Sequence, residues 1–193
     1  GALFHEYYPA RNYLLPAHTA FQGTSYTYVR DFSTIWSQVL IYRATGKKPM
    51  SDEMAYLPYD ITYASRSDDN YFREGDDEPE VLHGKPRTIL SNYNALLISS
   101  LYKDPYLKRE FLHRNRDGGM FGYDFSGVTP VMYLCINDPD VEPAALSDLP
   151  KSKYFPSPNG KMVARTGWDM GIDADEAVVS MKIGEKDTTN HQH

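Results

Sequence analysis

The chain has 193 residues, and its hydrophobic fraction of 41% is enough for one large domain or for parts of two. It contains no apolar run long enough to span a membrane, and its single cysteine, Cys135, excludes both a disulfide framework and a zinc site built from cysteines. A net charge of −6 argues against a general nucleic-acid binder, whereas 16 tyrosines suit either a sugar-facing cleft or an ordinary core.

The first three quarters of the chain are predicted to be helical. Apolar side chains recur every three or four residues over 24–45, which predicts the strongest helix. Gly46 follows at the position where a glycine that ends a helix is expected. Other helical patterns cover residues 2–15 (interrupted at Pro9), 51–64 (interrupted at Pro58), 88–102, 106–114 and 125–136.

A polar stretch over residues 65–86 separates two of these helices. Its composition is compatible with a solvated loop or a disordered linker. Because it contains Tyr71 and Phe72 and lies between helices, we expect an ordered loop.

The pattern changes after residue 150. A turn signal over 156–160 precedes two segments that are typical of strands, 161–165 and 177–183. Helices followed by strands predict an α+β fold in two adjoining units rather than an interleaved one. We place the domains at 1–150 and 151–193, and we expect the chain to be an internal piece of a longer protein.

The chain ends in Asn-His-Gln-His, residues 190–193. In a strand, alternate side chains share a face, so His191 and His193 would project together, with Asn190 on the other side. Such a pair can bind one metal ion, or place one imidazole on a metal and the other on a substrate. The alternative is a polar strand end or a fragment of a tag.

Tyr26 stands at the start of the strongest predicted helix. The positive end of the helix dipole favours a phenolate there, and Arg30 adds a cation one turn later. Together they favour a general acid or base. The alternative is that Ser25 caps the helix and Tyr26 is a packed aromatic residue.

Three segments together resemble the heparinase II/III-like polysaccharide lyases. They are Gln-Gly-Thr-Ser-Tyr-Thr-Tyr-Val-Arg at 22–30, Ser-Pro-Asn-Gly-Lys-Met-Val-Ala-Arg-Thr-Gly-Trp at 157–168 and Asn-His-Gln-His at 190–193. The resemblance also takes in residues 10–12, 75–76, 102–107 and 110–112, in order along nearly the whole chain. It implies an incomplete helical (α/α) toroid followed by the start of an antiparallel β-sandwich.

The resemblance implies a role for each site residue. Tyr26 matches the catalytic tyrosine, His191 an active-site histidine, and His193 the first ligand of a structural zinc ion whose other ligands lie beyond this chain. The resemblance places Gln22, Arg30 and Asn190 near the substrate. One departure is Phe21, which stands where heparinase II members have a histidine. Another catalytic histidine and a glutamate would lie upstream of the chain.

The implied activity is β-elimination in a uronate-containing glycosaminoglycan, with heparin or heparan sulfate as the first candidates. Alternatives are a lyase for alginate or another acidic glycan, or a non-catalytic glycan-binding protein of the same fold. The expected partner is an acidic polysaccharide and not a nucleic acid. We expect no membrane span, and a homodimer is compatible with these expectations. The resemblance implies a periplasmic or secreted protein. Elimination requires the Tyr26 hydroxyl and the His191 ring to lie within about 10 Å of each other, across a cleft between the two units.

Overall fold

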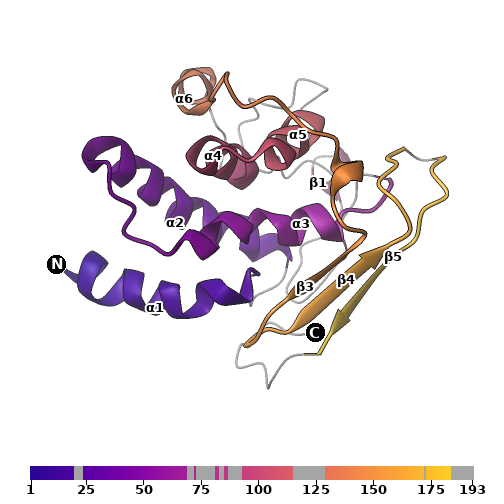
Figure 1. Cartoon of the computed structure of the whole chain (residues 1–193), viewed down its shortest axis with the longest axis horizontal. Coiled ribbons are helices and arrows are strands. Elements are labelled where there is room, and N and C mark those ends of the chain that lie inside the picture. The colour runs from indigo at the N-terminus through magenta and orange to yellow at the C-terminus, as the bar shows by residue number, and fades with distance from the viewer. Residues whose placement is uncertain are drawn as a thin grey trace.

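Helices form most of the described chain, and a small antiparallel sheet follows them, which confirms the predicted α+β class (Figure 1). The computed structural model describes residues 1–19, 24–68, 72, 81–82, 85–86, 93–114, 129–171 and 173–183, and it describes only the backbone of 24–30, 81–82 and 85–86. The toroid and the sandwich both stay predictions.

The helical segments follow the predicted order. They are the π-helix η1 (Leu3–Tyr7), α1 (Tyr8–Leu14), the 3-10 helix η2 (Leu15–Ala17), α2 (Thr24–Thr45), the 3-10 helix η3 (Asp52–Tyr56), α3 (Pro58–Ala64), α4 (Tyr93–Tyr102), α5 (Pro105–Arg114), α6 (Pro130–Ile136) and the 3-10 helix η5 (Leu146–Asp148).

Helix α2 has the predicted bounds. It ends at Thr45 because Gly46 has a φ of 70°, a left-handed conformation that a glycine adopts without steric cost. The Gly46 amide donates to the Tyr42 carbonyl oxygen at 2.7 Å, which satisfies one of the terminal carbonyl groups of the helix.

The two predicted interruptions mark changes of helix type. Pro9 lies in the first turn of α1 and Pro58 in the first turn of α3, where a missing amide hydrogen leaves no helical bond unmade. The chain passes directly from η1 into α1, and from η3 through the single turn residue Leu57 into α3.

Helix α6 is shorter than the predicted 125–136. Thr129 has an extended backbone, and its hydroxyl oxygen accepts the Met132 amide at 3.2 Å, which caps the helix. The helix therefore begins at Pro130. Residues 125–128 lie outside the described part of the chain, as do residues 88–92 at the start of the predicted 88–102 helix.

The C-terminal sheet has the order β3–β4–β5 and is antiparallel throughout. Its strands are β3 (Ser152–Phe155), β4 (Lys161–Arg165) and β5 (Val178–Lys182). The last two strands confirm the sequence predictions. Strand β3 was not predicted, because four residues with little alternation give a weak local signal and only pairing with β4 defines them. A two-residue ladder joins β1 (Val81–Leu82) and β2 (Lys85–Pro86).

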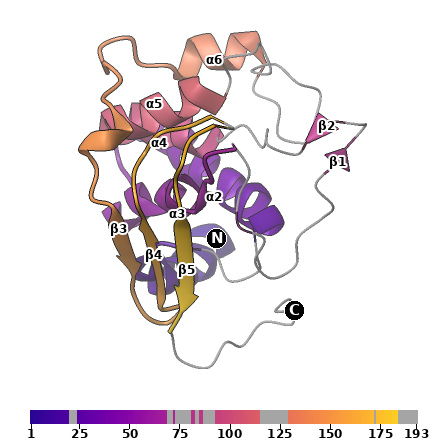
Figure 2. The same cartoon turned by 90° about the vertical axis from the view of Figure 1, so that its right-hand side faces the viewer.

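The sheet lies beside α3 in both Figure 1 and Figure 2, and α3 contacts β3 and β4. Phe155 and Val163 are fully buried in the same hydrophobic cluster as Ile61 and Tyr63 of α3. The rings of Tyr63 and Phe155 pack edge to face with centroids 6.5 Å apart. The helical part and the sheet therefore share one core, while the division into domains at 150 stays a prediction.

Candidate functional site

The candidate site begins at the first two turns of α2, whose backbone carries Tyr26 and Arg30. Their side chains lie outside the described part of the chain. Gln22, Asn190, His191 and His193 also lie outside the described residues. The shared cleft of Tyr26 and His191, and their separation of about 10 Å or less, therefore stay predictions.

A buried polar cluster ties the segment before α2 to the sheet, and Asp60 of α3 is its centre. The Lys161 ammonium of β4 donates to one Asp60 oxygen at 2.6 Å, and the Thr19 hydroxyl donates to the other. Asn159 donates from its side-chain amide to the Thr19 hydroxyl oxygen at 3.4 Å. All four residues are buried, each with 7% or less of its surface exposed.

This Asp60 cluster connects the 157–168 segment of the family resemblance to Thr19, which precedes the 22–30 segment. Thr19 lies shortly before the 22–30 segment, and Asn159 and Lys161 belong to the 157–168 segment. A buried charge needs a partner, because moving an unpaired ion from water into the protein interior costs several kcal/mol. Asp60 and Lys161 therefore hold the start of the sheet against α3 at one defined position.

Strand β4 turns a second cation inward. Lys161, Val163 and Arg165 alternate along its buried face, so two charged side chains flank one valine. The Arg165 guanidinium lies 3.9 Å from the centre of the Trp168 ring and forms an ion pair with Glu176 at 3.6 Å. Burial lowers the pKa of Arg165, and the neighbouring Glu176 opposes that shift.

Gly167 leaves room for the Glu176 carboxylate, which lies directly over it and would have to shift if a larger residue stood there. A Cβ atom there would lie 2.2 Å from the Glu176 Oε1 atom, closer than real contacts allow. The same Oε1 atom accepts the Asp169 amide at 2.6 Å. The Trp168 indole donates to the Leu149 carbonyl at 3.2 Å. The Ala-Arg-Thr-Gly-Trp segment thus holds the loops next to β4 in place through these contacts.

Other segments of the resemblance also have structural roles. Arg11 donates to the Thr34 hydroxyl at 3.1 Å, which joins α1 to α2. Glu110 and Arg114 form a buried ion pair at 3.0 Å within α5. Asp104 accepts the amide of Leu107 at 3.0 Å and so caps α5.

A cavity of about 770 Å³ lies between η3, α3, the α4–α5 corner and β3. We call it the tyrosine cavity, because six of its lining residues are tyrosines: Tyr56, Tyr59, Tyr63, Tyr102, Tyr106 and Tyr154. Burial, reinforced by the Asp104 carboxylate, raises the pKa of Tyr59 well above its usual range. Burial also raises the pKa of Tyr102, beside Asp52.

The described residues do not include a metal site. Within the ranges given above, no group of three or more His, Cys, Asp or Glu side chains is placed to hold a metal ion. The predicted zinc ligand, His193, lies outside the described residues, so the zinc site stays a prediction. No described helix is long and apolar enough to cross a membrane.

Sequence reasoning missed the Asp60 cluster and the tyrosine cavity. A signal for the first exists: Asp60 is the only charged residue in an otherwise apolar or neutral stretch over 54–65, which favours a buried carboxylate with a distant partner. The cavity had no such signal, because its walls come from segments far apart in the sequence.

Comparison with known proteins finds no protein-family model and no curated protein that matches this chain.

Proposed function

We propose that this chain is part of a polysaccharide lyase that cleaves uronate-containing glycosaminoglycans by β-elimination, with heparin or heparan sulfate as the first substrates to test. The proposal starts from the three segments that resemble the heparinase II/III-like lyases. The observation that supports it best is the Asp60 cluster, in which residues next to the first segment and within the second meet in one buried network.

That cluster favours the proposal because elimination needs groups from both parts of the chain on one sugar ring. The first turns of α2 follow Thr19 by a few residues, and the sheet is held to Thr19 through Asn159. If the chain continued from β5 as a strand, His191 would be presented by the same sheet. A rigid link between the helical part and the sheet is what such a composite site requires.

In the proposed reaction, Tyr26 and His191 act on adjacent atoms of a uronate. A base, Tyr26 or His191, takes the C5 proton, and the electron pair of the C–H bond forms the C4–C5 double bond. The bond from C4 to the glycosidic oxygen breaks, and a protonated Tyr26 can donate a proton to that oxygen. His191 or Arg30 would offset the carboxylate charge, which otherwise makes the C5 proton too weakly acidic. Gln22 and Asn190 would orient the sugar.

Zinc has a supporting role in this proposal. Bound through His193, it would fix the strand that presents His191, as structural zinc ions do. The chain's own side chains would carry out the proton transfers.

The direct test is a substrate panel with the full-length protein. Elimination creates an unsaturated uronate that absorbs in the ultraviolet, so product formation can be followed continuously. We expect activity on heparan sulfate or heparin, and less on chondroitin sulfate, hyaluronan and alginate. Activity on alginate only would replace the substrate class, and absence of product on every acidic glycan would contradict the lyase proposal.

The tyrosine cavity favours a second candidate function, which is glycan binding without catalysis. An aromatic-lined cavity of this size can hold one or two sugar rings. Binding of the same panel without any unsaturated product would favour this second function.

A further inference from the structure

Lys153 is the feature of the tyrosine cavity that the proposed lyase reaction does not use. It lies on β3, two residues from the buried Phe155, so both side chains point to the same face of the strand. Its ammonium nitrogen lies 5.2 Å from the ring centre of Tyr56, 5.5 Å from that of Tyr59 and 5.4 Å from that of Phe155. Three aromatic rings therefore surround one half-buried cation.

This cation has no anionic partner among the described residues. No hydrogen bond or ion pair joins the Lys153 ammonium to any described side chain or carbonyl group, and burial lowers its pKa. The other inward-facing lysine of the sheet, Lys161, is paired with Asp60. Aromatic faces compensate a cation only in part, so an anion that reached Lys153 would gain a charge-assisted contact in a partly dry site.

The carboxylates that line the tyrosine cavity are already occupied. Asp104 accepts the Tyr59 hydroxyl at 2.8 Å with one oxygen and caps α5 with the other. Asp52 accepts the Lys48 ammonium at 2.5 Å. Among the described lining residues, Lys103 is paired with Asp138, whereas Lys153 has no carboxylate partner and is the group to which an anionic ligand group would bind.

The cavity walls also suit a sugar ring. The Tyr59 and Tyr63 hydroxyls are fixed, at 2.8 Å on Asp104 and 2.9 Å on the Pro150 carbonyl, so these rings keep one orientation. Tyr56 and Tyr154 lie at the opening and are 43% and 53% exposed. The exposed rings at the opening can pack against the apolar face of a sugar, while the buried Tyr59 and Tyr63 form a rigid base.

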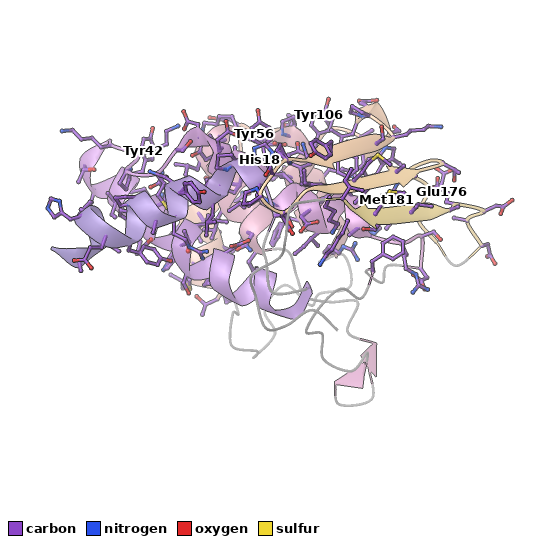
Figure 3. The ribbon with its side chains drawn as sticks, turned by 90° about the horizontal axis from the view of Figure 1, so that it is seen from below. His18, Tyr42, Tyr56, Tyr106, Glu176 and Met181 are labelled. Carbon is purple, nitrogen blue, oxygen red and sulfur yellow. The ribbon has the colours of Figure 1, made fainter. Side chains whose placement is uncertain are left out.

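The tyrosine cavity is separate from the first turns of α2. In Figure 3, Tyr56 and Tyr106 lie along one side of the molecule, and the first turns of α2 lie on the other. Figure 2 agrees, since β3 forms one edge of the view and the start of α2 lies beyond β5. A ligand in the cavity would therefore not occupy the site proposed for Tyr26.

We propose that the tyrosine cavity is a second, non-catalytic binding site for an acidic sugar unit, whose carboxylate or sulfate group contacts Lys153 while its ring packs on the tyrosines. The choice of a polysaccharide as the source of this unit rests on the proposed function. Such a site would hold one part of a polysaccharide while another part reacts. It would therefore raise the effective concentration of the polysaccharide at the catalytic residues.

The test measures binding stoichiometry by calorimetry, with a tetrasaccharide prepared from heparan sulfate and the full-length protein carrying Tyr26→Phe to prevent turnover. We expect two sites per protein. Adding Lys153→Met, which keeps the packing of the stem on the rings, should remove one site or weaken it by about tenfold or more. Lys153→Arg should keep that site within about threefold, because the charge remains.

Three controls complete the design. Lys182→Met, at the exposed end of β5, removes a lysine from the same sheet and should leave both sites unchanged. Tyr56→Leu should weaken the same site as Lys153→Met, because it removes a ring at the opening. A neutral tetrasaccharide, cellotetraose, should bind about tenfold or more weakly at the Lys153-dependent site, since it lacks the anion.

Two results would overturn the inference. One is unchanged stoichiometry and affinity in the Lys153→Met variant. The other is inorganic sulfate that binds at the Lys153-dependent site as tightly as the tetrasaccharide, which would make it a site for a free anion. If the lyase proposal alone is wrong, no unsaturated product forms with any glycan, yet the Lys153-dependent binding is still measured.

Discussion

The Lys161 ammonium lies 2.6 Å from the Asp60 carboxylate, although the two residues are 101 positions apart in the sequence. The pair joins β4 to α3 in the interior, where both side chains are almost fully buried. Thr19 and Asn159 extend the same cluster toward the segment that precedes α2. This buried ion pair therefore adds a specific polar link to the hydrophobic core that the helical part and the sheet share.

We expect Lys161→Met to lower the free energy of unfolding by about 3–5 kcal/mol, because it leaves the Asp60 charge buried without its partner. Urea unfolding measures this change. The double variant Asp60→Asn with Lys161→Met should recover most of the loss, since no charge is then buried. Lys182, which lies opposite Lys161 in the sheet register but is exposed, gives the matched control. Lys182→Met should change stability by less than about 0.5 kcal/mol.

We expect Gly167→Ala to destabilise the protein by about 1–3 kcal/mol, because the added methyl group would overlap the Glu176 carboxylate and displace it from Arg165. Thermal or urea unfolding provides the measurement. In a Glu176→Ala background the methyl group meets no carboxylate, so the same substitution should cost less. Equal costs in the two backgrounds would show that the overlap is not the cause.

Alkaline pH should destabilise the protein through Tyr59. Burial raises its pKa in the folded state, while the unfolded phenol has a pKa of about 10. Above about pH 10 the unfolded chain binds fewer protons than the folded one. The stability that Tyr59 provides is therefore complete below that pH and falls as pH rises, by up to about 1.4 kcal/mol per pH unit.

The measurement is the difference in unfolding free energy between the wild type and Tyr59→Phe from pH 8 to pH 11 or so. This difference should shift against the wild type above about pH 10. Lys153 gives the opposite sign as an internal check. Burial lowers its pKa, so between that lowered pKa and about 10.4 the wild type should gain stability relative to Lys153→Met as pH rises. A pH-independent difference for Tyr59→Phe would contradict the assignment.

If Tyr26 is the general acid or base, Tyr26→Phe in the full-length protein should lower kcat by roughly 10²- to 10⁴-fold while leaving substrate binding nearly unchanged. Ultraviolet absorbance of the unsaturated product gives kcat, and calorimetry with the heparan sulfate tetrasaccharide gives affinity. Tyr28→Phe, two residues later in the same helix, is the matched control and should keep most of the activity. A Tyr26→Phe protein with more than about a tenth of the wild-type kcat would count against the role.

If His193 binds zinc, His193→Ala should release the metal and lower the thermal stability, with a loss of activity as the consequence. Elemental analysis of the purified variant measures metal content independently of activity. His113→Ala, at the end of α5, removes a histidine elsewhere and should retain the metal. Full zinc occupancy in His193→Ala would leave His193 without a role as a ligand.

Local patterns in the sequence determined the elements whose ends carry their own signal. Helix α2 has both of its predicted ends because apolar periodicity and Gly46 act within one turn of the chain. Strands β4 and β5 followed from alternation for the same reason. The roles of Tyr26, His191 and His193 also come from the sequence, through the family resemblance, and they stay predictions.

Only the tertiary structure decided which charged residues are buried. By their chemistry alone, Lys161 and Arg165 would be assigned to a solvated face of the strand. Ion pairs with Asp60 and Glu176 offset the cost of burying these two cations. Strand β3 and the tyrosine cavity have the same origin, since both require segments that approach one another only in the folded chain. Periodicity reports the surroundings of one segment, whereas pairing and cavities depend on contacts between segments.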